Sequence, residues 1–326
     1  MGPHENRWLI TGGAGFIGSN LAADLLRAGA PVTVLDDLSS GQMRNIDRLG
    51  EYGDLFRFVR ANVLDGGAAA SALEGADVLV NLAAQVSVAR SIARPDETLL
   101  INDRGFRTVS ALALDMGVRR IVFASSAAVY GENPVQPLTE QSGRQPQSPY
   151  AESKVANEAA AAEMADRYPD LSVTGLRFFN IYGPNQAATG GYAAVIPAWL
   201  AAAEAGVSPV IFGDGGQTRD LCHVSDVVAV IRAVVRAARP GASVYNVGSG
   251  TSVTLLELLE TINKLGRQVG CVLPPPLFER PRAGDIRYSS CDIAALMRDI
   301  GWRPRVSLEE GLRALVMDCV GRRASR

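Results

Sequence analysis

A glycine-rich turn near the amino terminus constrains the fold more than any other feature of this chain. Gly12, Gly15 and Gly18 stand between an apolar run that ends at Thr11 and an alanine- and leucine-rich stretch of helical period. The first glycine permits a tight turn, the second lets a phosphate approach the backbone, and the third lets helix pack closely on strand. The stretch therefore predicts a strand–turn–helix unit that holds a dinucleotide pyrophosphate at the helix amino terminus.

An acidic residue follows at the distance that such a unit requires. Asp36 ends the next apolar run, eighteen residues after Gly18. A carboxylate there can accept hydrogen bonds from both hydroxyls of an adenosine ribose and repels a 2′-phosphate, so NAD is predicted rather than NADP. In the alternative interpretation Asp36 and Asp37 only cap a turn, but Asp36 is the better candidate because it ends the apolar run.

The first half of the chain alternates short β-branched runs with longer segments of helical period. This pattern predicts an α/β fold with a doubly wound parallel sheet, whose ligands bind at the carboxyl ends of the strands. We expect a dinucleotide-binding domain over 1–176 and a smaller, less regular substrate domain over 177–326, with 219–247 returning to the first domain. The predicted strands are 7–11, 31–36, 56–63, 77–83, 119–126 and 171–180.

Composition argues against several classes of partner. The formal net charge is −2, from 32 basic and 34 acidic residues mixed along the chain, so no basic footprint for nucleic acid is visible. The apolar run 192–203 is too short to span a bilayer and contains a proline. The 4 cysteines lack metal-ligand spacing. We therefore expect a cytoplasmic protein without a membrane segment or a metal site.

A tyrosine and a lysine four residues apart are the candidate catalytic pair. Tyr150 and Lys154 follow Pro149 at the start of an alanine-rich helix, so their side chains project from one face. A nearby ammonium favours the phenolate, which predicts a lowered pKa for Tyr150 and a base that works near neutral pH. Ser126, at the end of a predicted strand, would offer its hydroxyl to the same substrate oxygen.

Several motifs, in order along the chain, resemble one family. The segments TGGAGFIG, FASSAAVYG, PYAESK, RFFNIYGP, GDGGQTRD and RAGD are together similar to the extended short-chain dehydrogenase/reductase family. Within that family the nucleoside-diphosphate-sugar 4-epimerases of the UDP-glucose/UDP-galactose type are the nearest match, over Trp8 to about Gly311.

The resemblance implies a role for each matching position. Ser126, Tyr150 and Lys154 would form the catalytic triad. Proteins of this family commonly dimerise through a pair of helices, so a homodimer is implied. The implied cofactor-binding residues, besides Tyr150 and Lys154, are Gly12, Gly15, Phe16, Ile17, Gly18, Asp36, Asn62, Val63, Ala83 and Asn102. The implied sugar-nucleotide-binding residues are Ser87, Ser126, Asn180, Arg219, Arg282, Asp285 and Ser289. Arginines suit a diphosphate because they are planar and permanently charged.

Four positions depart from the family pattern. Asn62 stands where the family often has Asp, which is expected to alter the adenine contact, and Asn81 stands where it often has His. Leu221 and Ala194 replace a tyrosine and an asparagine of the UDP-galactose enzymes. The nucleotide base and the sugar therefore stay open. We assign no chemistry to His223.

The implied activity is NAD-dependent epimerisation at C4 of a nucleoside-diphosphate hexose through a transient 4-keto sugar. Dehydration is disfavoured because Ala127 and Ala128 stand where a related 4,6-dehydratase carries Asp-Glu. A uronate epimerase or decarboxylase is the next alternative, and a net reductase follows. A non-catalytic NAD-binding protein would usually lack the tyrosine or the lysine, and both are present here.

One position bears on the sugar. Ser289, seven residues after Arg282, matches a site where a tyrosine restricts the C2 substituent in the UDP-galactose enzymes. The small serine predicts a pocket that admits 2-acetamido sugars as well as plain hexoses.

Overall fold

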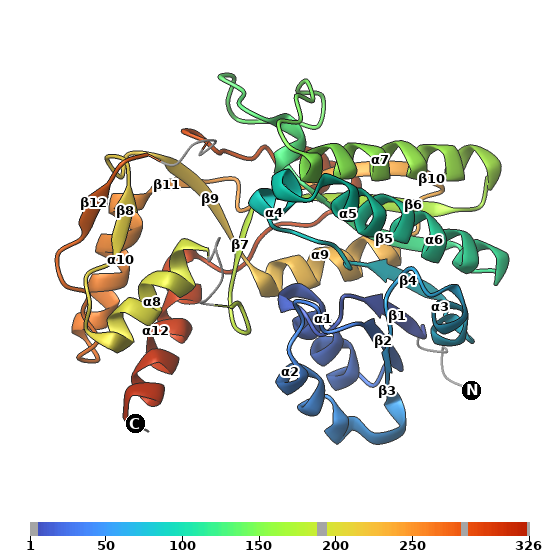
Figure 1. Ribbon diagram of the computed structural model, residues 1–326, viewed down its shortest axis with the longest axis horizontal. Coiled ribbons are helices and arrows are strands. Elements are labelled where there is room, and N and C mark those ends of the chain that lie inside the picture. Colours follow the sequence, from blue (N-terminus) through green and yellow to red (C-terminus); the bar gives the residue numbers. More distant parts are fainter. Residues whose placement is uncertain (1–5, 188–193, 282–285, 325–326) are drawn as a thin grey trace.

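A parallel sheet forms the centre of the computed structural model, which describes residues 6–187, 194–281 and 286–324. Among these residues, a seven-stranded sheet has the order β10-β6-β5-β4-β1-β2-β3, and every neighbouring pair is parallel (Figure 1). All six predicted strands are present, although 56–63 ends at Arg60 and 171–180 ends at Phe178. The strands are β1 (Trp8–Thr11), β2 (Val32–Asp36), β3 (Phe56–Arg60), β4 (Val78–Asn81), β5 (Arg120–Ser126), β6 (Ser172–Phe178) and β10 (Gly241–Val247).

The strand order places the topological switch point of the sheet at the carboxyl end of β1. This strand lies between β2 and β4, so the connections that leave β1 and β4 run in opposite directions along the sheet. Thr11 and Asn81, the last residues of β1 and β4, lie opposite each other. A ligand at this switch point would contact the glycine turn after β1 and the loop after β4.

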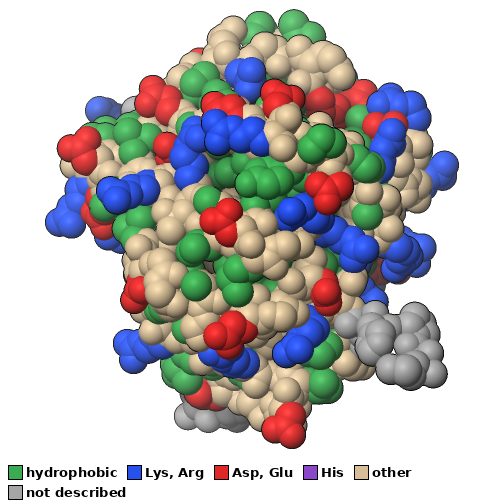
Figure 2. Space-filling view, turned by 90° about the vertical axis from the view of Figure 1, so that its right-hand side faces the viewer, with side chains coloured by type: hydrophobic (Ala, Val, Ile, Leu, Met, Phe, Trp, Pro, Cys, Tyr) green, Lys and Arg blue, Asp and Glu red, His purple; other side chains and the backbone are tan. Residues whose placement is uncertain are grey.

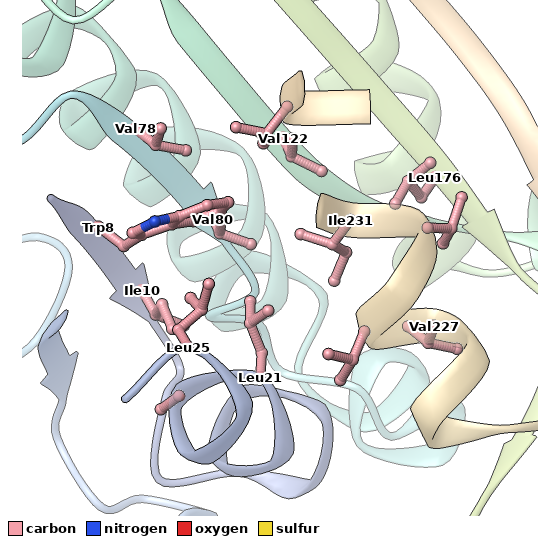
Figure 3. Packing of buried hydrophobic residues seen from close by; sticks show 14 of the residues in the cluster. Trp8, Ile10, Leu21, Leu25, Val78, Val80, Val122, Leu176, Val227 and Ile231 are labelled. Carbon is pink, nitrogen blue, oxygen red and sulfur yellow. The ribbon is translucent and has the colours of Figure 1, made fainter. Parts of the chain in front are cut away.

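Helices cover both faces of the sheet because its apolar side chains alternate in direction. Trp8 and Ile10 pack on the face covered by α1 and α9, whereas Leu9 between them packs on the face covered by α3, α6 and α7. Figure 3 shows Leu21 of α1 and Ile231 of α9 in the first of these cores. These helices are α1 (Phe16–Arg27), α3 (Gly66–Leu73), α6 (Gly105–Asp115), α7 (Pro149–Arg167) and α9 (Val224–Ala237).

The segment expected to return to the sheet contributes a strand and a helix. β10 pairs with β6 along its whole length, from Gly241 opposite Ser172 to Val247 opposite Phe178, and α9 packs against α1. β9 (Thr218–His223), in contrast, pairs with β7 (Asn180–Tyr182) and β11 (Ser252–Thr254) outside the central sheet. The division of the chain at residue 176 stays a prediction.

The carboxyl-terminal half builds a second core around three helices, on the left of Figure 1. Its buried residues include Trp199, Leu258 and Leu312, one from each helix. The helices are α8 (Val195–Ala205), α10 (Leu255–Arg267) and α12 (Leu308–Ala324), and the two-stranded sheet beside them is β8 (Val210–Phe212) with β12 (Leu277–Glu279).

The remaining elements are short connections between these layers. They include α2 (Met43–Asp47), η1 (Gly50–Leu55), α4 (Val88–Ala93), α5 (Pro95–Leu99), η2 (Leu100–Arg104), η3 (Ala127–Tyr130) and α11 (Ala294–Ile300). On the face shown in Figure 2, acidic and basic side chains are interspersed with hydrophobic ones. No helix in the described ranges has the length and apolar character needed to cross a membrane.

Candidate active site

The glycine turn has the geometry of a phosphate cradle. Gly12 has φ +70°, and a Cβ on it would lie 2.7 Å from the backbone nitrogen of Ala83. A Cβ on Gly18 would lie 2.4 Å from the carbonyl oxygen of Gly12, so larger residues are excluded at both positions. Helix α1 begins at Phe16 without a side-chain cap, because its N-cap residue is Gly15. The amino-terminal N–H groups of α1 thus suit an anionic pyrophosphate.

Asp36 lies beside this turn, at the end of β2. Its carboxylate accepts hydrogen bonds from the backbone N–H of Ala14 (2.9 Å) and of Leu38 (2.8 Å). Burial raises the pKa of Asp36, and the two backbone hydrogen bonds oppose that rise. The carboxylate therefore joins the glycine turn to the loop after β2, where the adenosine ribose of NAD is predicted to bind.

The hydrogen bonds of Asn62 explain why an amide suits this position, where the family often has an aspartate. The Asn62 side chain donates a hydrogen bond to Asp37 (2.7 Å) and accepts one from the Leu64 N–H (3.0 Å). An aspartate at position 62 would set two carboxylates against each other. Its neighbour Val63, another predicted cofactor residue, is buried in the sheet core against Gly105.

Hydrogen bonds tie the loop after β4 to the rest of the predicted site. The Ala83 N–H donates to the Thr11 hydroxyl (3.2 Å), which donates to the Asn81 amide oxygen (2.7 Å). Asn102, in the π-helical segment η2, accepts from the Gln85 N–H (2.7 Å) and donates to the Gln85 carbonyl oxygen (3.0 Å).

The structure brings Ser126, Tyr150 and Lys154 together at the carboxyl edge of the sheet. Ser148 caps α7 by accepting from the Ala151 N–H, so Tyr150 lies in its first turn. The Lys154 ammonium donates to the Ala124 carbonyl oxygen (2.9 Å) and lies 5.7 Å from the centre of the Tyr150 ring. The Ser126 hydroxyl accepts from the Ala128 N–H (3.2 Å), and it is the polar group that lowers the pKa of Tyr150.

Burial, and not the lysine, dominates the ionisation of the tyrosine. Burial raises the pKa of Tyr150, and the hydrogen bond with Ser126 lowers it only in part. Burial also lowers the pKa of Lys154 to about 8. The prediction that Lys154 lowers the pKa of Tyr150 was therefore wrong for the protein alone, because both groups are desolvated in the same place.

The predicted sugar-nucleotide residues fall into two groups. Ser87 caps α4, and its hydroxyl accepts from the Arg90 N–H (3.2 Å). Asn180, in β7, donates to the Asp220 carbonyl oxygen (3.2 Å) and to the Ser289 hydroxyl (3.4 Å).

Arg219 directly precedes Asp220, whose carbonyl oxygen Asn180 contacts. Its guanidinium donates to the carbonyl oxygens of Thr218 (2.8 Å) and Ile286 (2.7 Å). Arg282 and Asp285 lie outside the described residues. Leu221, in place of the family tyrosine, is buried in the second core.

One buried acid at this site was missed from the sequence. The Asp220 carboxylate accepts from the N–H groups of Ser249 (2.6 Å) and Gly250 (3.0 Å) and from the Ser249 hydroxyl (2.8 Å). Burial raises its pKa to about 6. Its position directly after Arg219 was the available signal, but the partner residues lie about thirty positions away.

The fold and the site together define a class. The protein combines a doubly wound sheet, this glycine turn and a Ser126–Tyr150–Lys154 triad. These features define an NAD-binding enzyme of the short-chain dehydrogenase/reductase class. The model of the NAD dependent epimerase/dehydratase family matches residues 8–248. The chain belongs to that family.

Known proteins resemble the chain along nearly its whole length. It is 39% identical to the UDP-glucose 4-epimerase of Mycolicibacterium smegmatis over 316 residues, 95% of this chain and 97% of the relative. Among solved structures, the UDP-N-acetylglucosamine 4-epimerase from Methanobrevibacter ruminantium M1, in complex with UDP-N-acetylmuramic acid, has a TM-score of 0.89 and 32% identity, covering 98% of this chain and 100% of that chain. The UDP-glucose-4-epimerase from Stenotrophomonas maltophila, with bound NAD and formylated UDP-arabinopyranose, has a TM-score of 0.90 and 27% identity, covering 99% and 100%. These relatives support C4 epimerisation of a nucleoside-diphosphate sugar with NAD as cofactor.

Proposed function

We propose that the protein interconverts the C4 epimers of UDP-hexoses, including UDP-glucose and UDP-N-acetylglucosamine. The observation that carries this proposal is the grouping of Ser126, Tyr150 and Lys154, together with the two alanines, Ala127 and Ala128, that directly follow Ser126. The triad supplies acid and base at one sugar hydroxyl, and the alanines supply no second pair for elimination of water. The reaction that remains is oxidation and reduction at one carbon.

The residues divide the work of the reaction. NAD, held by the glycine turn and Asp36, would supply the hydride acceptor and donor for C4. Tyr150 removes the proton of the 4-hydroxyl and later gives it back, while Ser126 hydrogen-bonds the same oxygen. Arg219 would hold the diphosphate and leave the sugar free to turn, so that either face of C4 can be presented to the cofactor. The anchor is thus at the nucleotide rather than at the sugar.

A panel of sugar nucleotides tests the proposal. Purified protein is incubated with UDP-, GDP-, CDP- and dTDP-hexoses and with UDP-glucuronate, and the products are separated by chromatography. We expect C4 epimers of the UDP-hexoses with no change in total reduced cofactor. Conversion of UDP-glucuronate alone would favour the uronate epimerase or, if a pentose forms, the decarboxylase.

Asp36→Ala should narrow the preference for NAD over NADP. The change removes both a ribose acceptor and the charge that repels a 2′-phosphate. Dissociation constants for both dinucleotides, measured on wild type and variant, check this. Tighter binding of NADP by the wild type would show that Asp36 does not set cofactor choice.

Ser289→Tyr should selectively reduce activity on 2-acetamido sugars. Ser289 contacts Asn180, and a bulky ring there would fill the space for the C2 substituent. Overfilling a pocket costs about 1 to 3 kcal/mol, which corresponds to tenfold or more in discrimination. The ratio of kcat/KM for UDP-glucose and UDP-N-acetylglucosamine measures the effect. An equal loss on both substrates, or none on either, would exclude this gate.

We infer further that the protein is a cytoplasmic homodimer. Apolar side chains on the surface of α4, α5 and η2 support a subunit interface there, since Ile92 is 64% exposed, Leu99 38% and Leu100 42%. The buried thiols of Cys222 and Cys291 belong to no disulfide, which is consistent with a reducing compartment. Sedimentation equilibrium would report twice the mass of the chain, and a monomer at micromolar concentration would contradict the dimer.

A further inference from the structure

The end of strand β5 and helix α7 meet through consecutive residues of the strand. The carbonyl oxygen of Ala124 accepts from the Lys154 ammonium (2.9 Å). Two residues on, the Ser126 hydroxyl accepts from the Ala128 N–H (3.2 Å) and lowers the pKa of Tyr150. The catalytic contacts therefore depend on the position of the strand end along the helix.

Ser125 supplies a third contact between these two catalytic ones. Its hydroxyl donates to the Glu158 carboxylate (2.6 Å), and Glu158 follows Lys154 by one turn of α7. Ser125 is 2% exposed and the side chain of Glu158 3% exposed. A hydrogen bond to a buried carboxylate is stronger than one between neutral groups.

The carboxylate of Glu158 is itself held in place. Arg177, in β6, binds it through two nitrogens, Nε (2.8 Å) and Nη2 (2.7 Å). The third nitrogen of Arg177 donates to the Tyr130 hydroxyl (2.7 Å) and to the Glu140 carbonyl oxygen (3.2 Å). Bidentate pairing fixes both the distance and the plane of the carboxylate. Glu158 thus offers Ser125 a rigid acceptor.

We propose that Ser125 and Glu158 are positioning residues whose hydrogen bond fixes the register of β5 against α7, and thereby places the Ser126 hydroxyl against the Tyr150 phenol. Neither side chain is part of the triad itself. The expected fall in kcat rests on the proposed epimerase function, whereas the placement of Ser126 against Tyr150 does not.

Ser125→Ala tests the proposal, because it removes one hydroxyl and leaves the Glu158–Arg177 pair intact. We expect kcat to fall about tenfold, with KM for the sugar nucleotide within about twofold, since small displacements of a reacting group are costly. The matched control is Ser110→Ala, which removes a buried hydroxyl that has no hydrogen-bond partner in the described chain. It should leave kcat unchanged.

A second readout needs no turnover. Tyrosine labelled with ¹³C at Cζ reports the ionisation of Tyr150, assigned by its loss in Tyr150→Phe. In the NAD-bound protein, Ser125→Ala should move the titration midpoint to higher pH, because a loosened Ser126 hydrogen bond no longer lowers the pKa. If the protein epimerises no sugar nucleotide, this titration still tests the positioning role.

A double variant separates positioning from general loss of stability. If Ser125 acts through Ser126, the Ser125→Ala change in a Ser126→Ala background should lower kcat by less than about twofold. Multiplicative losses of kcat, a Tyr150 midpoint equal to that of wild type, or an unchanged kcat in Ser125→Ala would each overturn the proposal. Urea unfolding of each variant confirms that the assayed protein is folded.

Discussion

Tyr150→Phe lowers turnover of the preferred sugar nucleotide by about a hundredfold to ten-thousandfold, the usual contribution of a general base. The phenol is the group that can take the proton of the 4-hydroxyl, and Ser126 lowers its pKa. NAD affinity should stay near that of wild type, because the glycine turn and Asp36 are untouched. Steady-state kinetics and calorimetric titration with NAD measure the two quantities.

The matched control for this variant lies directly after the same helix. Tyr168 follows the last turn of α7, where its ring packs under the guanidinium of Arg119 at 5.2 Å. Tyr168→Phe should keep turnover close to that of wild type. A Tyr150→Phe protein that retains near wild-type turnover would remove Tyr150 from the mechanism.

Lys154→Met should abolish measurable turnover and yet stabilise the cofactor-free protein at pH 7. The Lys154 side chain is buried, and burial lowers its pKa from 10.5 to about 8. At pH 7 the folded protein therefore holds a desolvated ammonium. The shift corresponds to about 3 kcal/mol, from which the lost hydrogen bond to Ala124 subtracts about 1. The variant should gain about 2 kcal/mol, a cost that the catalytic lysine imposes on the fold.

The stability gained by Lys154→Met should decrease as the pH rises. Between pH 8 and 10.5 the unfolded wild-type chain binds more protons than the folded one, so wild-type stability rises with pH through this window. The advantage of Lys154→Met is present in full below about pH 8 and disappears as the pH approaches 10.5. Urea unfolding at pH 7 and pH 10 measures it. A variant that is less stable at pH 7, or a difference that does not change with pH, would contradict the burial of a charged lysine.

The fold was predictable from the sequence where the signal is local. The runs that form β1 to β6 are rich in β-branched or aromatic residues and bounded by turns or helical segments, so each was visible by itself. β10 was foreseen only as a returning segment of uncertain extent. The first four residues of β10 are exposed or half-buried, and only Tyr245, Asn246 and Val247 are fully buried. Its pairing with β6, some seventy residues earlier, is set by tertiary contacts.

The candidate site was also predictable only where its residues are close together in the sequence. The glycine turn and the Tyr150–Lys154 pair depend on short spacings and were visible in the sequence. The hydrogen bonds of Ser125 with Glu158 and of Asp220 with Ser249 join residues about thirty positions apart, and no spacing rule relates them. The pKa of Tyr150 was predicted in the wrong direction because the sequence reveals the neighbouring charge but not the desolvation of both groups.

Retention of deuterium at C4 tests the central claim most directly. UDP-glucose and UDP-N-acetylglucosamine, each labelled with deuterium at C4, are incubated with the protein in ordinary water, and the products are analysed by mass spectrometry and NMR. Because the same hydride leaves C4 and returns to it, we predict that the galacto-configured product keeps its deuterium at C4 and that no reduced cofactor accumulates. Loss of the deuterium to solvent, or the absence of a C4 epimer from both substrates, would contradict the account.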